Sequence, residues 1–180
     1  YTEENGGSRV DETTALDKNF SAYARFELKT LNVTPPADGI GYTVDLYDSS
    51  SVNYGGSYTF AITVADHYKA DNMKVYANGI LLVPNKNGNV YTFTAENITD
   101  DVLIYMHGIT ADIYTVKYTV DGEVGHSESV VYNGKAQKPK SPVKTGYVFT
   151  GWFAGDDEYD FESQVESDIY LEAKFEPVSY

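Results

Sequence analysis

The stretch KVYANGILLV, residues 74–83, decides the class of fold. Two apolar runs, Val75–Ala77 and Ile80–Leu82, are separated by Asn78 and Gly79. An Asn-Gly pair suits the type I′ turn, because both central residues of that turn need a positive φ angle. We therefore predict a β-hairpin at this point.

Short strand-like runs continue on both sides of the hairpin. From Tyr58 to Val64 every second residue is large and apolar, which directs one face of a strand into a core. Turn-forming glycines separate the runs, and five or six short strands in roughly 70 residues are typical of a small Ig-like β-sandwich. The predicted strands are Tyr42–Tyr47, Tyr58–Val64, Lys74–Ala77, Ile80–Val83, Val90–Ala95 and Val102–His107.

Composition excludes several classes of protein. The 180 residues include 27 acidic and 13 basic side chains, for a net charge of −14. Such a chain is poorly suited to nucleic acid or an anionic membrane, because phosphate binding needs clustered Lys and Arg. The chain has no cysteine, so disulfides, thiolate metal sites and a cysteine nucleophile are impossible. No apolar run approaches the ~20 residues that cross a bilayer, and we expect no membrane insertion.

The two ends of the chain resemble one another. Residues 10–27 align with residues 159–176 without a gap, and four of the aligned pairs are identical. Self-similarity of this kind is the signature of repeat arrays, so we interpret the chain as a piece of a longer tandem protein. The identical pairs are Asp11 with Asp160, Ala24 with Ala173, Phe26 with Phe175, and Glu27 with Glu176.

Domain boundaries follow from the loops. Pro35 and Pro36 impose an extended path and mark the first predicted boundary. From Asp112 the chain runs on without a Pro or Ser spacer, so the modules on either side should have a limited range of orientations. The predicted organisation is a tail of a preceding repeat (1–33), an Ig-like β-sandwich (34–111) and a second β module (112–180).

The second module carries four matching segments in a fixed order. They are YTVKYTVDG (114–122), VVYNGKAQKPKSPVKTGYVFTGWF (130–153), YDFESQV (159–165) and DIYLEAKF (168–175). With these segments, residues 114–176 resemble the Listeria-Bacteroides repeat, the B-repeat of internalin-type surface proteins, with a partial copy at 10–27.

The resemblance implies a β-grasp-like module, α+β but dominated by strands, that occurs in tandem on bacterial surface and secreted proteins. It also implies a spacer or adhesive role without catalysis. The chain departs from the family in its turn at 121–125, where members commonly have Asn-Gly-Gly, and at Phe175, where they commonly have Trp.

The signature of this module is rich in glycine and aromatic residues. Because large aromatics supply the most burial per residue, we expect Trp152 to anchor the core, with ligand stacking as the alternative. The signature residues, to which we assign structural roles, are Gly146, Tyr147, Phe149, Gly151 and Trp152.

Tyrosine is the most prominent candidate for binding, with 17 in the chain. Exposed tyrosines on β faces hold sugars or protein partners, because the ring offers area at little entropic cost. The alternative is that they form cross-strand pairs that only build the strands. The candidate ligand-binding residues are Tyr54, Tyr58, Tyr68 and Tyr76.

Metal binding and catalysis have little support. Asp156, Asp157 and Asp160 would offer oxygen ligands to calcium, but they lack the spacing of a calcium loop, and an acidic turn is commonly just hydrated. No Gly-x-Ser-x-Gly elbow is present, so we predict no catalytic residue and no cofactor. A Lys-Asn crosslink would replace the absent disulfides, but no pair is indicated. The histidines, none in a metal-ligand spacing, are His67, His107 and His126.

Charge in the second module is segregated. A lysine-rich segment precedes Asp156, and an acidic segment follows it. Attraction between the lysines of one repeat copy and the acids of the next would explain this, and so would two solvated faces. The lysines are Lys135, Lys138, Lys140 and Lys144.

We therefore expect a non-catalytic fragment of a bacterial cell-surface or secreted protein, acting as adhesion and spacer modules in a tandem array. The expected partner is a host or matrix protein or a glycan. The alternatives are an accessory carbohydrate-binding segment of an extracellular glycan-degrading enzyme, and a pure structural spacer.

Overall fold

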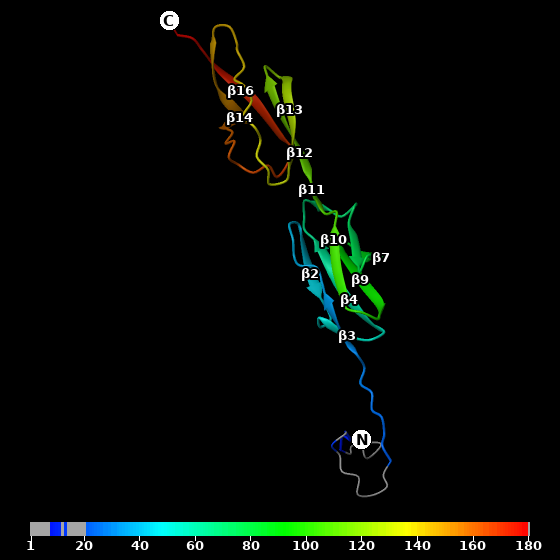
Figure 1. Ribbon diagram of the computed structural model, residues 1–180. Coiled ribbons are helices and arrows are strands. Elements are labelled where there is room, and N and C mark those ends of the chain that lie inside the picture. Colours follow the sequence, from blue (N-terminus) through cyan, green and yellow to red (C-terminus); the bar gives the residue numbers. More distant parts are fainter. Residues whose placement is uncertain (1–7, 12, 14–20, 180) are drawn as a thin grey trace.

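The computed structural model describes residues 8–11, 13 and 21–179 of the chain. These residues form strands and no helix, so the helical part of the predicted α+β module is absent from them. Figure 1 shows two β bodies following one another, with residues 21–29 leading into the first and β16 ending the second.

The first body contains two sheets. The larger has the order β3-β1-β10-β6-β7, with β1 and β10 parallel and the other pairs antiparallel. The smaller is antiparallel, in the order β2-β4-β9-β8. The strands of the larger sheet are Thr30–Thr34 (β1), Ser51–Asn53 (β3), Lys74–Ala77 (β6), Ile80–Leu82 (β7) and Val102–His107 (β10). Those of the smaller are Tyr42–Leu46 (β2), Gly56–Val64 (β4), Asn85–Asn87 (β8) and Val90–Ile98 (β9).

The predicted strands and hairpin of this body are confirmed. All six predicted runs are strands, with ends shifted by a few residues. Asn78 and Gly79 have φ angles of 46° and 84°, and Ala77 pairs with Ile80 across them, as a type I′ hairpin requires. The alternating apolar residues of β4 lie in the core between the sheets.

The start of the first body differs from the prediction. Thr30–Thr34, which we assigned to the preceding tail, forms β1, and its Leu31 and Val33 are buried in the core. The prolines that follow end a strand; they do not separate two modules. Of the predicted partial copy at 10–27, residues 12 and 14–20 lie outside the described residues, and residues 21–27 form no strand.

A short ladder leads from the first body to the second. Tyr68–Lys69 (β5) pairs with Thr110–Ala111 (β11), and Asp112 alone separates β11 from β12. The second body is one sheet in the order β13-β12-β16-β14-β15, in which only the β12–β16 pair is parallel. Its strands are Ile113–Val120 (β12), Glu123–Val131 (β13), Tyr147–Ala154 (β14), Asp157–Glu158 (β15) and Ile169–Pro177 (β16).

Extended segments cover this sheet where a helix was expected. Asn133 and Gly134 exchange backbone hydrogen bonds with Val165, which joins the segment after β13 to the segment after β15. Ala136 and Val165 from these segments are buried against the sheet. The two bodies therefore have separate cores, which share no residue.

Candidate functional surfaces

The structure separates the four candidate tyrosines. Tyr58 is fully buried in the core of the first body, and burial raises the pKa of its hydroxyl, so it cannot offer a binding surface. Tyr54 is exposed in the turn after β3. Tyr68 and Tyr76 lie in two different clusters, at the junction of the bodies and on the outer face of the larger sheet.

Tyr76 belongs to what we call the outer-face patch. Its ring is nearly parallel to that of Tyr105, its cross-strand neighbour, with centroids 5.2 Å apart and planes at 15°. In this stacked arrangement each ring covers part of one face of the other. Such a pair suits protein side chains better than stacking on a sugar ring. The patch comprises Tyr76, Leu81, Leu103, Tyr105 and His107.

Asp112, the only residue between the bodies, is held from both sides. Its N–H donates to the carbonyl oxygen of His67 in the first body, and its carbonyl accepts from the N–H of Tyr132 in the second, both at 2.8 Å. The Lys69 ammonium lies 2.7 Å from the Asp112 carboxylate, and this hydrogen bond raises the pKa of Lys69. A linker residue bonded in this way has little freedom to rotate.

Aromatic contacts surround this residue, and we call the cluster the aromatic joint. His67 Nδ1 lies 2.8 Å from the Tyr114 hydroxyl, and its ring stacks on Tyr132 with centroids 4.4 Å apart. Tyr68 meets the same Tyr132 ring edge-on at 5.9 Å. His67, in the turn before β5, and Tyr68, in β5, therefore contact the second body. Their partners there are Tyr114 and Tyr132.

His67 adopts an unusual backbone conformation in this joint. Its φ of 65° is left-handed, which costs a residue other than glycine about 1–2 kcal/mol. Such conformations persist where surrounding contacts hold them. Sequence reasoning treated His67 as solitary; only its place between two strands, where glycine would be the usual choice, could have indicated a role.

The structure places the candidate acidic residues Asp156 and Asp160 in local contacts. Asp156 lies 3.6 Å from the Lys174 ammonium, and Asp160 accepts a hydrogen bond from the Glu162 N–H at 2.9 Å. Within the described part of the chain, no three Asp, Glu, His or Cys residues approach closely enough to bind a metal ion.

The signature residues lie in and around the second core. Trp152 is 4% exposed, and its ring meets those of Tyr118 and Phe149 at 5.1 and 5.6 Å. Gly151 is buried beside the bulge of β14. Gly146 has a φ of 81°, as the turn before β14 requires, and Tyr147 is exposed.

A polar network crosses this core. The Tyr118 hydroxyl lies 2.6 Å from Glu128 Oε1 and 2.8 Å from the carbonyl oxygen of Gln137, either of which accepts its proton. The Gln137 N–H donates to the same Glu128 oxygen at 2.9 Å. Burial, together with Glu128, raises the pKa of Tyr118. The network ties the segment after β13 to the sheet.

Lysines of the charged segments pair within the same module. Lys135 contacts Glu162 and Lys144 contacts Asp121, both at 2.5 Å. Such exposed pairs contribute little to stability. Two of the four lysines therefore have acidic partners within their own module, and attraction to a second repeat copy is not needed to explain them.

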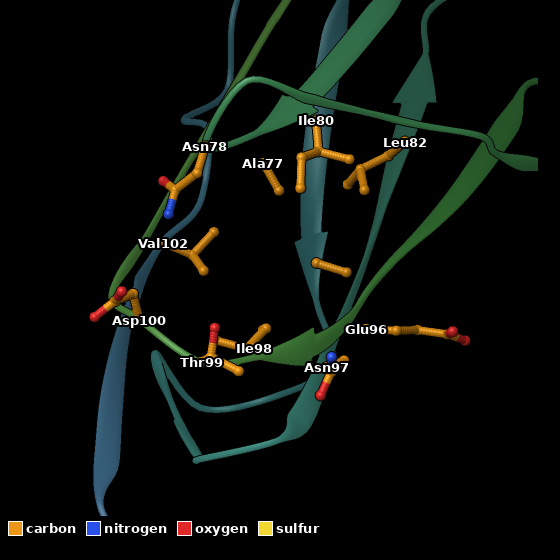
Figure 2. Close-up of a pocket in the computed structure, with 11 residues that line it drawn as sticks. Ala77, Asn78, Ile80, Leu82, Glu96, Asn97, Ile98, Thr99, Asp100 and Val102 are labelled. Carbon is orange, nitrogen blue, oxygen red and sulfur yellow. The ribbon is translucent and has the colours of Figure 1, made fainter.

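An apolar pocket of about 310 Å³ lies at the end of the first body where the chain enters β1, since Asp100 of its lining contacts Lys29. Figure 2 shows Ile80, Leu82 and Val102 around the hollow, while Glu96 and Asp100 extend away from it. We call it the end pocket. It has no cluster of titratable groups directed inward, so it offers apolar contact and no chemistry.

Parts of this chain are similar in sequence to known proteins. Residues 114–174 match the Listeria-Bacteroides repeat domain family. Internalin H of Listeria monocytogenes is 27% identical in an alignment of length 163, and the match spans 73% of this chain and 29% of Internalin H. The chain therefore corresponds to less than a third of that relative. None of the described residues forms a helix long and apolar enough to cross a membrane.

Proposed function

We propose, on the premise that residues 114–174 form a Listeria-Bacteroides repeat domain, that this chain is a projecting segment of a bacterial surface or secreted protein. In this proposal the β-sandwich and the repeat alternate in a tandem array, form a semi-rigid rod and present binding surfaces. The similarity to Internalin H supports a surface location, although it covers only 29% of that protein.

The observation that carries the proposal is the aromatic joint. A freely hinged connection needs several unconstrained residues, whereas Asp112 is bonded to His67 on one side and Tyr132 on the other. Stacking of His67 on Tyr132 adds a side-chain contact to the backbone bonds. The modules would then keep one mutual orientation and move as a unit.

Topology supports the finer fold assignments within this proposal. The first body has two facing sheets of short strands, as an Ig-like sandwich does. The second has a central parallel pair, β12 and β16, flanked by β13 and β14, which fits a β-grasp-like sheet whose helix is replaced by extended segments.

The proposed role is non-catalytic. Within the described part of the chain, the end pocket is lined by no histidine, and its two carboxylates, Glu96 and Asp100, extend away from the hollow.

Loosening the joint tests the rod. In His67→Gly the left-handed backbone is retained without strain, but the contacts with Tyr114 and Tyr132 are lost. We expect unchanged stability of the sandwich and a larger range of module orientations, measured by NMR residual dipolar couplings and by small-angle scattering.

His107→Gly is the matched control, because this histidine lies in the same module but outside the joint. It should leave the orientations unchanged. Independent tumbling of the two modules in the unaltered chain would contradict the rod.

The outer-face patch supports a binding role in addition to the spacer role. Exposed apolar residues that gather on one face commonly mark an interaction surface, and the overlap of Tyr76 with Tyr105 favours a protein partner. We therefore propose a host or matrix protein as the partner of this face.

Replacing Tyr105 and Leu81 together by serine should abolish binding to a panel of purified matrix proteins. Tyr170→Ser, at an exposed position of the central strand β16 of the repeat, is the control and should bind as the unaltered chain does. Binding on a glycan array that depends on Tyr105 would favour the carbohydrate-binding alternative. No binding in either assay would leave the pure spacer.

A further inference from the structure

Lys29 contacts the end of the sandwich where the chain enters β1. The Tyr54 N–H donates to the carbonyl oxygen of Lys29 at 2.8 Å, and the Lys29 ammonium lies 4.0 Å from the Asp100 carboxylate. Asp112 likewise has a backbone bond and an ion pair to the sandwich. Lys29 and Asp112 therefore share two kinds of contact with the sandwich, a backbone hydrogen bond and an ion pair.

Self-similarity of the chain indicates which module would precede Lys29. The alignment of residues 10–27 with 159–176 extends to place Leu28 at Pro177, the last residue of β16. Since β1 begins at Thr30, Lys29 alone would separate a preceding repeat from the sandwich. Both joints of the array would then contain a single residue, and modules joined by one residue must touch.

Two apolar side chains just before Lys29 are exposed. Phe26 is 91% exposed, and Leu28 is exposed as well. Phe175, the counterpart of Phe26, packs against Phe149 inside the repeat at a centroid distance of 5.7 Å. The rest of a repeat would cover Phe26 in the same way and would stand directly against this end of the sandwich.

The surface that such a repeat would meet is the end pocket. Its lining is apolar at Ile80, Leu82 and Val102, it carries Glu96 and Asp100, and it includes no basic residue. Asp100 also contacts Lys29, so the end pocket and the joint residue belong to the same end of the sandwich.

The repeat offers a matching loop where its last strand ends. The Val178 N–H donates to the carbonyl oxygen of Gly146 at 2.9 Å, so the loop KSPVKTG, residues 140–146, lies beside the exit of the chain. Val143 at the centre of this loop is 97% exposed, and Lys140 and Lys144 flank it. Val143 with Lys140 beside it complements an apolar pocket with two carboxylates at its rim, whereas Lys144 is paired with Asp121 in its own module.

We propose that the end pocket is the docking site for the 140–146 loop of a preceding repeat, a second copy of the module at 114–178. The inference rests on the proposed tandem array and adds the contact that would fix its second joint. Each sandwich would then be held at both ends. The aromatic joint at Asp112 would fix the repeat that follows it, and the docked loop near Lys29 would fix the repeat that precedes it.

The test extends the full chain with its own repeat. Residues 112–177 replace residues 1–28, so that a repeat precedes Lys29, and the methyl NMR signals of Ile80, Leu82 and Val102 are compared with those of the original chain. We expect these signals to shift and those of Ile62, buried in the sandwich core, to stay. Unmoved signals in a folded extended chain would overturn the docking.

A matched pair of variants assigns the shift to the loop. Val143→Asp in the added repeat should return the three signals to their original positions, whereas the same substitution in the C-terminal repeat should not. Equal effects of the two variants would contradict the proposed occupant. If the sandwich and the repeat that follows Asp112 showed no fixed mutual orientation in the same sample, that result would instead contradict the proposed semi-rigid rod.

The original chain gives a second measurement if the extended chain does not fold. Linked modules meet at an effective concentration of about 1 mM, so two separate chains at that concentration should show the same methyl shifts. Shifts that grow with concentration and disappear in Val143→Asp would support docking, and constant signals would overturn it.

Discussion

At the scale of the residue, the hydrogen bonds of a buried hydroxyl determine how much stability a substitution there removes. Tyr118 and Tyr58 are both fully buried, but the Tyr118 hydroxyl reaches Glu128 and Gln137, whereas that of Tyr58 has no hydrogen-bond partner in the described part of the chain. Removing a buried hydroxyl costs the hydrogen bond that it made. The two tyrosines should therefore respond differently to the same substitution.

Tyr118→Phe should lower the free energy of unfolding of the repeat by about 1–2 kcal/mol, because the bond to Glu128 is lost. Tyr170→Phe, at an exposed position, should change it by less than about 0.5 kcal/mol. Urea unfolding followed by the fluorescence of Trp152 measures both. Equal values for the two variants would show that the network contributes no stability.

Stability at high pH follows from the same residue. Because the pKa of Tyr118 is raised in the folded protein, the unfolded chain releases this proton first, near pH 10. The folded state then binds more protons, so the free energy of unfolding decreases as the pH rises above about 10. Tyr118→Phe should make this decrease shallower, as measured by urea unfolding between pH 8 and 11.

At the scale of the element, strands were predictable where the local sequence signals were strong. The β6–β7 hairpin was predictable because Asn78 and Gly79 carry the turn chemistry themselves. β1 was assigned to the tail because its partner β10 lies about 70 residues away, and two prolines after it imitate a linker. The described residues form no helix, and Ala136 and Val165, from extended segments, pack into the core where a helix was expected.

The turn between β10 and β11 depends on Gly108. Its φ is 95°, and a Cβ there would lie 2.0 Å from the carbonyl oxygen of Asn72. Gly108→Ala should therefore destabilise the sandwich by more than about 2 kcal/mol. Thermal unfolding followed by far-UV circular dichroism measures this loss.

Gly88→Ala separates the two causes. Gly88 also has a positive φ, 61°, but a Cβ there would meet open space. Gly88→Ala should lower the free energy of unfolding of the sandwich by only about 1 kcal/mol. If both variants lost the same stability, the contact with Asn72 would be unimportant.

At the scale of the whole molecule, two cores and one joint predict two unfolding transitions. The chain has one tryptophan, Trp152, so its fluorescence reports on the repeat alone. Phe93→Ala, in the core of the sandwich, should destabilise the sandwich by about 3–5 kcal/mol and move the fluorescence transition far less. Leu171→Ala, in the repeat core, should do the reverse.

Circular dichroism and fluorescence, recorded together during urea unfolding, give the two transitions. The aromatic joint should couple them only weakly, because it buries few side chains. A common shift of both transitions in Phe93→Ala would show that the bodies unfold as one unit.

The sequence alone determined the β class, most strands, the repeat at 114–176 and the exclusion of disulfide and thiolate chemistry. These features depend on local patterns, spacing or simple counts, which a linear chain displays directly. Tertiary structure decided which residues meet. It buried Tyr58, overlapped Tyr76 with Tyr105, and brought His67 onto Tyr132 across 65 positions of sequence. Such contacts depend on how separate elements pack, and no local pattern encodes them.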